Sequence, residues 1–141
     1  MEYLPIYLEL KHASVLLVGG GKVATRKARL MLRAGAVLTV VAPEITNELA
    51  QLVEKHSATW LQAAYDIDSA SQGEGGLVHL FSHLVLVVAA TPDRAVNEHV
   101  AADAKAHGIP VNVVDSPELS TFIVPSIVDR SPLIVAISSS G

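Results

Sequence analysis

The amino-acid sequence predicts an α/β fold with a mainly parallel β-sheet flanked by helices, and three observations support this prediction. Half of the 141 residues are hydrophobic but only 4% are aromatic, so the core must consist of Val, Leu, Ile and Ala. Aliphatic runs of this kind are typical of parallel strands that are buried on both faces. Strand-like and helix-like patterns also alternate along most of the chain, and the length suits one core.

The N-terminal third predicts two strand–helix pairs. Ala13–Val18 is an aliphatic run that stops at three consecutive glycines, which indicates a strand followed by a tight turn. Helical spacing follows over residues 22–34 and ends at Gly35, a residue type that tolerates the left-handed conformation after a helix. The same reasoning predicts a strand at Val37–Val41 and a helix over about residues 44–56.

The middle of the chain contains the strongest strand signal. Thr59–Leu61 predicts a weaker third strand, and residues 63–76 are polar, rich in Gly and Ser and without periodicity, which indicates a surface loop. The dense apolar run Leu84–Ala90 predicts the fourth strand.

The C-terminal third predicts one more helix and strand, and then a different arrangement. Thr91 is the expected N-cap of a helix with Pro92 in its first position and Gly108 at its end. Val111–Val114 predicts the fifth strand. Two apolar runs on either side of residues 129–132 then predict an antiparallel strand pair, with Pro125 at an edge or a bulge.

Charge and composition argue against several classes of function. The net charge of −4 argues against a general nucleic-acid partner or an anionic membrane surface. The chain has no cysteine, which excludes disulfides and thiolate chemistry and fits a cytoplasmic location. Residues 75–92 lack charged side chains, but their dense apolar part is shorter than the roughly 20 residues of a membrane span. The start of the chain has no positive region typical of an export signal.

The glycine turn carries the clearest functional motif. Gly19, Gly21 and Ala24 occupy the three defined positions of the G-x-G-x-x-G/A fingerprint, between a predicted strand and a predicted helix. Lys22 and Val23 open the helix, whose free N–H groups can bind phosphates. We therefore predict a Rossmann-like dinucleotide-binding fold. The alternative is a structural α/β domain whose glycine turn holds no ligand.

The residues after the second strand bear on the choice of cofactor. An acidic residue is expected there, about 20 residues beyond the glycine turn, to bind the ribose 2′-hydroxyl. The sequence instead has Ala42 and Pro43, and Glu44 is the only acid nearby. No Arg is present to receive a 2′-phosphate, which favours NAD over NADP. Pro43, Glu44 and Thr91 complete the candidate cofactor-binding residues.

Half of the positive charge lies on the first predicted helix, which carries five of the ten basic residues: Lys22, Arg26, Lys27, Arg29 and Arg33. At 100° per residue, Lys27 falls on the apolar side and the other four form one stripe. A solvated face is the ordinary interpretation of such a stripe. Because cations near a helix N-terminus oppose the helix dipole, a polyanionic ligand is the alternative.

The histidines suggest no metal site. His79 and His83 have a spacing that can hold a metal on a helix, but no Glu adjoins them and the stretch is apolar. We expect an ordinary core or surface pair and no permanent metal.

The chain contains, in order, the segments LPIYLEL, VGGGKVATRKA, VVAATPDRAVNEHV, VNVVD and FIVPSIVDRSPLIVAIS. Together they resemble the N-terminal module of siroheme synthase, the precorrin-2 dehydrogenase and sirohydrochlorin ferrochelatase family. The resemblance implies NAD-dependent oxidation of precorrin-2 to sirohydrochlorin, and in many relatives insertion of ferrous iron, as a substrate, to give siroheme. Both substrates are tetrapyrroles with many carboxylates, so Arg26 and Lys27 become candidate substrate contacts.

Asp115 matches the essential aspartate of that family. It also follows a predicted strand, at the sheet edge where α/β proteins bind ligands. An Asp before Ser-Pro commonly starts a turn, which is the structural alternative. The resemblance favours catalysis, in which this carboxylate accepts the proton released as hydride leaves for NAD, and later takes pyrrole protons as iron enters. Asn112 is a further candidate substrate contact.

The resemblance also implies the wider organisation. Residues 1–116 would form the NAD-binding domain and residues 117–141 the start of a dimerisation and substrate region. Relatives continue into a helical region that dimerises and covers the tetrapyrrole, so we expect a homodimer and a truncated chain. Ser139 corresponds to a serine that can be phosphorylated, although a frayed end is the simpler interpretation. A non-catalytic NAD(H)-binding regulatory or sensor module is the alternative function, but it would not need Asp115 with Asn112.

Overall fold

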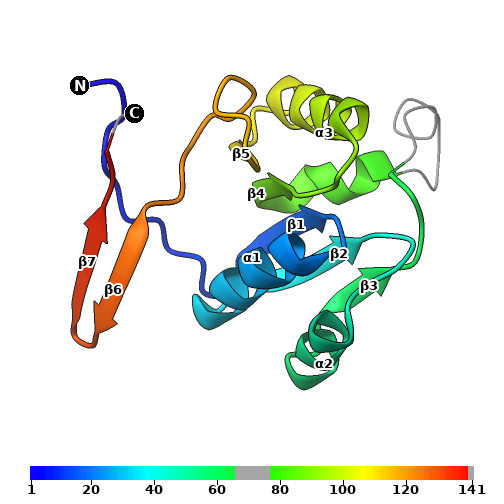
Figure 1. Ribbon diagram of the computed structural model, residues 1–141, viewed down its shortest axis with the longest axis horizontal. Coiled ribbons are helices and arrows are strands. Elements are labelled where there is room, and N and C mark those ends of the chain that lie inside the picture. Colours follow the sequence, from blue (N-terminus) through cyan, green and yellow to red (C-terminus); the bar gives the residue numbers. More distant parts are fainter. Residues whose placement is uncertain (66–76, 140–141) are drawn as a thin grey trace.

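The computed structural model describes residues 1–65 and 77–139 and confirms the α/β fold (Figure 1). Five strands form one parallel sheet in the order β3-β2-β1-β4-β5. The bounds of these strands are β1 Ser14–Val18, β2 Val37–Val41, β3 Thr59–Leu61, β4 Leu84–Ala89 and β5 Val111–Val113. The central strand β1 pairs with both β2 and β4, so the aliphatic runs of highest density occupy the middle of the sheet.

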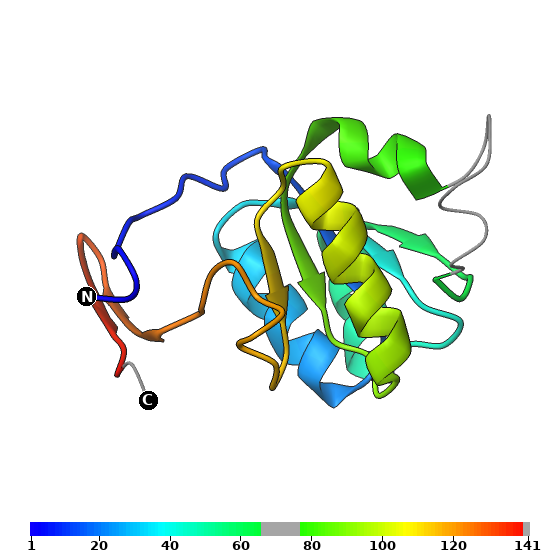
Figure 2. The ribbon, with the colours of Figure 1, turned by 90° about the horizontal axis from the view of Figure 1, so that it is seen from above.

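Helices cover both faces of the sheet. Their bounds are α1 Lys22–Arg33, α2 Asn47–Lys55 and α3 Arg94–Ala106, with a 3₁₀ helix, η1, at Leu77–His83. Buried residues of α1 and α2 pack on one face, whereas those of α3 and η1 pack on the other. Figure 2 shows α3 lying over the strands, with α1 behind them. The largest fully buried side chains are all Leu or Val, as the composition predicts.

Two helices begin later than the sequence pattern predicts. The N-cap of α3 is Asp93, whose carboxylate accepts from the N–H groups of Ala95 and Val96 at 2.9 and 3.3 Å. The prediction that Thr91 caps this helix is therefore wrong. The second helix, α2, begins at Asn47 behind the N-cap Thr46, and not at about residue 44. The preceding residues instead pack against the glycine turn.

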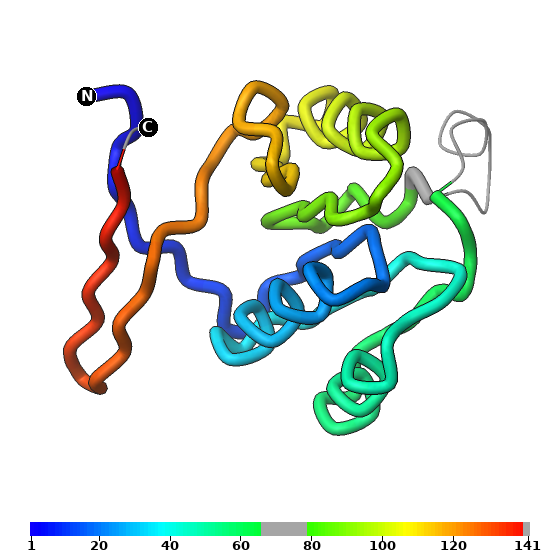
Figure 3. Tube along the Cα trace, viewed as in Figure 1, coloured from blue at the N-terminus to red at the C-terminus, as the bar shows by residue number. Residues whose placement is uncertain are grey.

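The predicted antiparallel pair forms a hairpin that stands apart from the sheet. It consists of β6 Ser126–Arg130 and β7 Leu133–Ile137, and Pro125 lies just before β6. Every residue of both strands is exposed. Figure 3 traces this hairpin and the N-terminal segment beside it, away from the sheet. The Tyr7 hydroxyl donates to the Ile134 carbonyl at 3.2 Å. We call residues 126–137 the hairpin arm.

Three further sequence expectations concern the segment around η1. Of the loop expected at 63–76, residues 66–76 lie outside the described part of the chain. His79 and His83 are both exposed and lie on the 3₁₀ helix. Within residues 1–65 and 77–139, no helix is long and apolar enough to cross a membrane.

Candidate cofactor and substrate site

A cavity of about 530 Å³ opens at the carboxyl ends of β1, β2 and β4. The residues that line it include the glycine turn, the segment after β2 and the segment after β4. Among the predicted cofactor residues, five line this cavity: Gly19, Gly21, Pro43, Glu44 and Thr91. Segments far apart in the chain thus meet at the sheet edge where α/β folds bind nucleotides.

The three glycines have different structural roles. Gly19 has φ +130°, and a Cβ added there would lie 2.4 Å from the Ala90 carbonyl oxygen. A Cβ on Gly20 would lie 1.9 Å from the Glu44 carbonyl oxygen. A Cβ on Gly21 would meet no heavy atom within 4 Å. The first two glycines therefore let the protein pack on itself, whereas the third faces open space that fits a phosphate close to the backbone.

The start of α1 completes the phosphate cradle. Lys22 is exposed in the first position of the helix, Val23 is half-buried, and Ala24 is fully buried against the sheet. The small side chain at Ala24 lets helix and strand approach closely. The N-cap Gly21 has no side chain to occupy the N–H groups of the first turn, which suits an anion. These residues fit the pyrophosphate of a dinucleotide.

A group of residues that motif reasoning did not identify holds the cavity wall to the glycine turn. The Thr46 N–H donates to the Gly20 carbonyl at 3.0 Å. The Thr25 hydroxyl donates to the Gly21 carbonyl at 2.8 Å and lies 2.7 Å from the Thr46 hydroxyl. On the other side, Trp60 Nε1 donates to the Ala42 carbonyl at 2.9 Å. The one available signal was Thr25, a polar residue at a buried position of α1.

The segment after β4 is held by Asn97 of α3, which is also a residue that sequence reasoning missed. Asn97 is buried, and its Oδ1 accepts from the Thr91 N–H at 3.2 Å and the Thr91 hydroxyl at 2.7 Å. Its Nδ2 donates to the Thr91 carbonyl at 3.0 Å. Three hydrogen bonds therefore fix Thr91 in the cavity wall, where it cannot act as a helix cap.

Asp115 lies in the turn after β5, at the same edge of the sheet. It is exposed and has φ +58°, in the left-handed region that non-glycine residues seldom adopt. The turn is closed by the Ser116 N–H, which donates to the Val113 carbonyl at 3.2 Å. Strained backbone of this kind is concentrated at functional sites.

Asn112 lies on β5 and has an unsatisfied acceptor. The residue is 8% exposed, and its Nδ2 donates to the Phe122 carbonyl at 3.1 Å. Its Oδ1 has no hydrogen-bond partner in the described residues. A buried acceptor without a donor costs about 1–3 kcal/mol, so such groups are uncommon unless a ligand or water supplies the donor.

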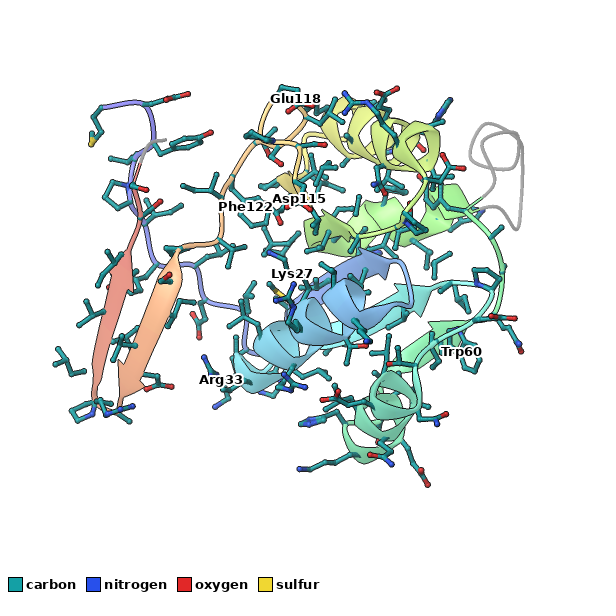
Figure 4. The ribbon with its side chains drawn as sticks, viewed as in Figure 1. Lys27, Arg33, Trp60, Asp115, Glu118 and Phe122 are labelled. Carbon is teal, nitrogen blue, oxygen red and sulfur yellow. The ribbon has the colours of Figure 1, made fainter. Side chains whose placement is uncertain are left out.

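Lys27 is half-buried on the side of α1 nearer to Asp115 (Figure 4). Burial lowers the pKa of its ammonium group below the ordinary value, the charge of Arg26 lowers the pKa further, and the Asp115 carboxylate opposes both effects. Arg26 itself is exposed. We call Lys27, Asn112 and Asp115 the substrate cluster.

The remaining basic residues and Ser139 lie outside this cluster. Arg29 pairs with Glu48 of α2, and both side chains are exposed, which agrees with a solvated face. Ser139 is exposed two residues beyond the end of the hairpin arm, where it helps to line a separate cavity of about 370 Å³. The structure brings it to neither the nucleotide cavity nor the substrate cluster.

Comparison with known proteins agrees with this geometry. The chain is 51% identical to siroheme synthase of Azotobacter vinelandii and 52% identical to that of Chromobacterium violaceum, over its whole length. It spans 28% of the length of each of these relatives. Among solved structures, SirC, a precorrin-2 dehydrogenase, superposes with a TM-score of 0.73 at 31% identity. That superposition covers 99% of this chain and 63% of SirC.

These matches confirm the resemblance that the sequence motifs indicated. Residues 6–126 also match the protein family described as "Putative NAD(P)-binding". This range includes the glycine turn, the cavity wall and the substrate cluster. The chain therefore belongs to that family of NAD(P)-binding proteins.

Proposed function

We propose that this chain catalyses the NAD-dependent oxidation of precorrin-2 to sirohydrochlorin. The observation that carries the proposal is the unpartnered Oδ1 of Asn112 in the substrate cluster, which also contains the strained Asp115. Both residues lie at the sheet edge that also bears the nucleotide cavity. The similarity to SirC, a precorrin-2 dehydrogenase, and to siroheme synthases supports a tetrapyrrole of the precorrin type as the substrate.

The chemistry assigns a separate task to each member of the cluster. Bound NAD⁺ supplies the hydride acceptor. The oxidation removes one hydride and one proton from the tetrapyrrole, and the exposed Asp115 carboxylate takes the proton. Asn112 Oδ1 accepts a substrate N–H, which satisfies the buried oxygen. The Lys27 ammonium group pairs with a substrate carboxylate, which compensates its burial.

The direct test is incubation of the chain with precorrin-2 and NAD⁺ while the absorption of sirohydrochlorin is followed. Asp115→Asn keeps the size of the side chain but removes the base, so we expect a loss of about 100-fold or more in kcat. Glu54→Gln, which neutralises an exposed carboxylate on α2, is the matched control. If Asp115→Asn turns over at the wild-type rate, the assigned role is wrong.

The cofactor assignment has an independent test. Gly21→Asp would place a carboxylate in the open space beside the start of α1, so we expect NADH binding to be lost. Calorimetry measures binding, and an unchanged unfolding midpoint shows that the variant is folded. Undiminished binding would contradict the placement of the pyrophosphate. A sensor module without chemistry would bind NAD(H) but show no turnover of precorrin-2.

We extend the proposal to a homodimer in which the hairpin arms of the two copies pack against each other. Its exposed apolar side chains include Leu133, Ile134 and Ile137, and Leu4 and Ile6 of the N-terminal segment are exposed as well. Such a surface favours a second copy because burial removes apolar area from water. Light scattering after size exclusion should give a dimer mass, and Leu133→Lys with Ile137→Lys should give a monomer. A monomeric wild-type chain would contradict this extension.

A further inference from the structure

We infer that Ser120 is a positioning residue for Asp115, and that its hydroxyl holds the turn from which this carboxylate acts as the base. The inference rests on the proposed function, because it concerns the same oxidation. Ser120 follows the turn in the chain and is not among the described residues that line the nucleotide cavity. It therefore adds a residue that affects the chemical step and not the binding of the cofactor.

The first observation is that the backbone at Asp115 needs support. Its φ of +58° lies in the left-handed region, which a residue with a side chain keeps only where the surrounding structure holds it. Asp115 is exposed, so the direction of its carboxylate depends on the backbone on either side of it. Before it, the Val114 N–H donates to the Ala89 carbonyl at 3.0 Å, which ties the turn to β4. After it, Ser116 is buried.

The second observation is that the Ser120 hydroxyl contacts both ends of this turn. Its Oγ accepts from the Val113 N–H at 2.9 Å. The same oxygen lies 3.0 Å from the Ser116 carbonyl oxygen and 3.2 Å from the Val113 carbonyl oxygen, so its single hydrogen is donated to one of them or shared. One hydroxyl thus joins the last residue of β5 to the residue directly after Asp115.

The third observation is that Ser120 is held independently of its hydroxyl. Its N–H donates to the Pro117 carbonyl at 3.1 Å, and the next N–H, that of Thr121, donates to the Val111 carbonyl at 2.8 Å. These backbone bonds fix the segment along β5, the last strand in the order of the sheet. Removal of the hydroxyl should therefore release the turn without displacing the segment that bears it.

The neighbouring Thr121 separates a positioning role from a purely structural one. Its Oγ1 accepts from the Val111 N–H at 2.8 Å, as the Ser120 Oγ does from the Val113 N–H. Both hydroxyls satisfy an amide of β5, and this is the structural alternative to positioning. Within the described residues, however, the hydroxyl of Thr121 bonds to Val111 alone, four residues before Asp115. Thr121→Val is therefore a matched control.

The test is the oxidation of precorrin-2 at saturating NAD⁺ by the wild type, Ser120→Ala, Ser120→Thr and Thr121→Val. Ser120→Ala should lower kcat by about tenfold or more, because a small displacement of a reacting group is costly, while its dissociation constant for NADH stays unchanged in calorimetry. Ser120→Thr keeps the hydroxyl and should retain most of the wild-type rate. Thr121→Val should lower the midpoint of unfolding in urea about as much as Ser120→Ala but keep the wild-type kcat.

The second readout uses the variant without the base. A residue that acts through Asp115 should have no further effect once that carboxylate is removed, so Ser120→Ala should leave the residual rate of Asp115→Asn unchanged. A purely structural role would lower the residual rate by the same factor as in the wild type.

The outcomes separate the inference from the proposed function. If Ser120→Ala keeps the wild-type kcat, or lowers the rate equally with and without the Asp115 carboxylate, the inference fails and the proposed function stands. If the wild-type chain does not oxidise precorrin-2, the proposed function fails and the inference fails with it.

Discussion

The hydrogen bond between the Thr25 and Thr46 hydroxyls links the phosphate turn to the N-terminus of α2, and a double-mutant cycle can measure it. Thr25 is 2% exposed, and the two oxygens are 2.7 Å apart. Replacement of Thr by Val keeps the shape of each side chain and removes the hydroxyl. The four proteins of the cycle are the wild type, Thr25→Val, Thr46→Val and the double variant.

The contacts of each hydroxyl set the expected losses of unfolding free energy. Thr46→Val removes the N-cap bond to the Leu49 N–H and the bond to Thr25, at about 1 kcal/mol each, so about 2 kcal/mol in total. Thr25→Val removes the bonds to the Gly21 carbonyl and to Thr46, again about 2 kcal/mol. The shared bond is lost in both, so the double variant should lose about 3 kcal/mol, with a coupling of about 1 kcal/mol.

Equilibrium unfolding in urea measures these differences. Thr59→Val, at an exposed position of β3, is the control and should change stability by less than about 0.5 kcal/mol. Thr46→Ser, which restores the hydroxyl, should recover most of the loss. If the two single losses add to within about 0.3 kcal/mol of the double loss, the hydroxyls do not interact and the reasoning is refuted.

Three further predictions concern other residues of the fold and the site. Gly20→Ala should weaken NADH binding and lower the unfolding midpoint, because its Cβ would lie 1.9 Å from the Glu44 carbonyl oxygen; unchanged binding by calorimetry would contradict this. Burial lowers the pKa of Lys27 in the folded state, so its charged form destabilises the fold at pH 7. Lys27→Met should therefore raise the midpoint of unfolding in urea at pH 7. This gain in stability should become smaller towards pH 10, where the lysine of the unfolded chain also loses its proton. Burial and the hydrogen bond to Asp103 raise the pKa of Tyr65 in the folded state, so the neutral phenol stabilises the fold. This stabilisation is complete at pH values below the pKa of a tyrosine in the unfolded chain, which is about 10. Tyr65→Phe should therefore be less stable at pH 7, and its deficit should shrink above about pH 10, as urea titrations across this range would show.

The fold was predictable where local pattern and burial agree. The aliphatic runs at 13–18, 37–41 and 84–90 form the three central strands, as expected for strands that are covered on both faces of a parallel sheet. The start of α3 was not predictable in the same way, since Thr91 and Asp93 are both competent caps. The choice between them depends on Asn97, which occupies the Thr91 hydroxyl from the interior of the helix.

The site was predictable where it depends on a motif and not where it depends on long-range contacts. The glycine turn and the position of Asp115 after a strand were visible in the sequence. Position 20 requires glycine because the Glu44 carbonyl packs against it, and Glu44 belongs to the segment that follows β2. The unpartnered Oδ1 of Asn112 likewise depends on its amide nitrogen being bound by the Phe122 carbonyl. Neither contact leaves a periodic signal.

The separation of the hairpin arm from the sheet divides the chain into two regions of unequal local stability. A two-stranded pair alone is marginal in water, whereas the amides of β1 lie in ladders with strands on both sides. In hydrogen–deuterium exchange, Val15–Val18 should exchange only through global unfolding, and the arm should exchange through local opening. Protection of the arm therefore measures how much of it is covered by another molecule, independently of the state of the nucleotide fold.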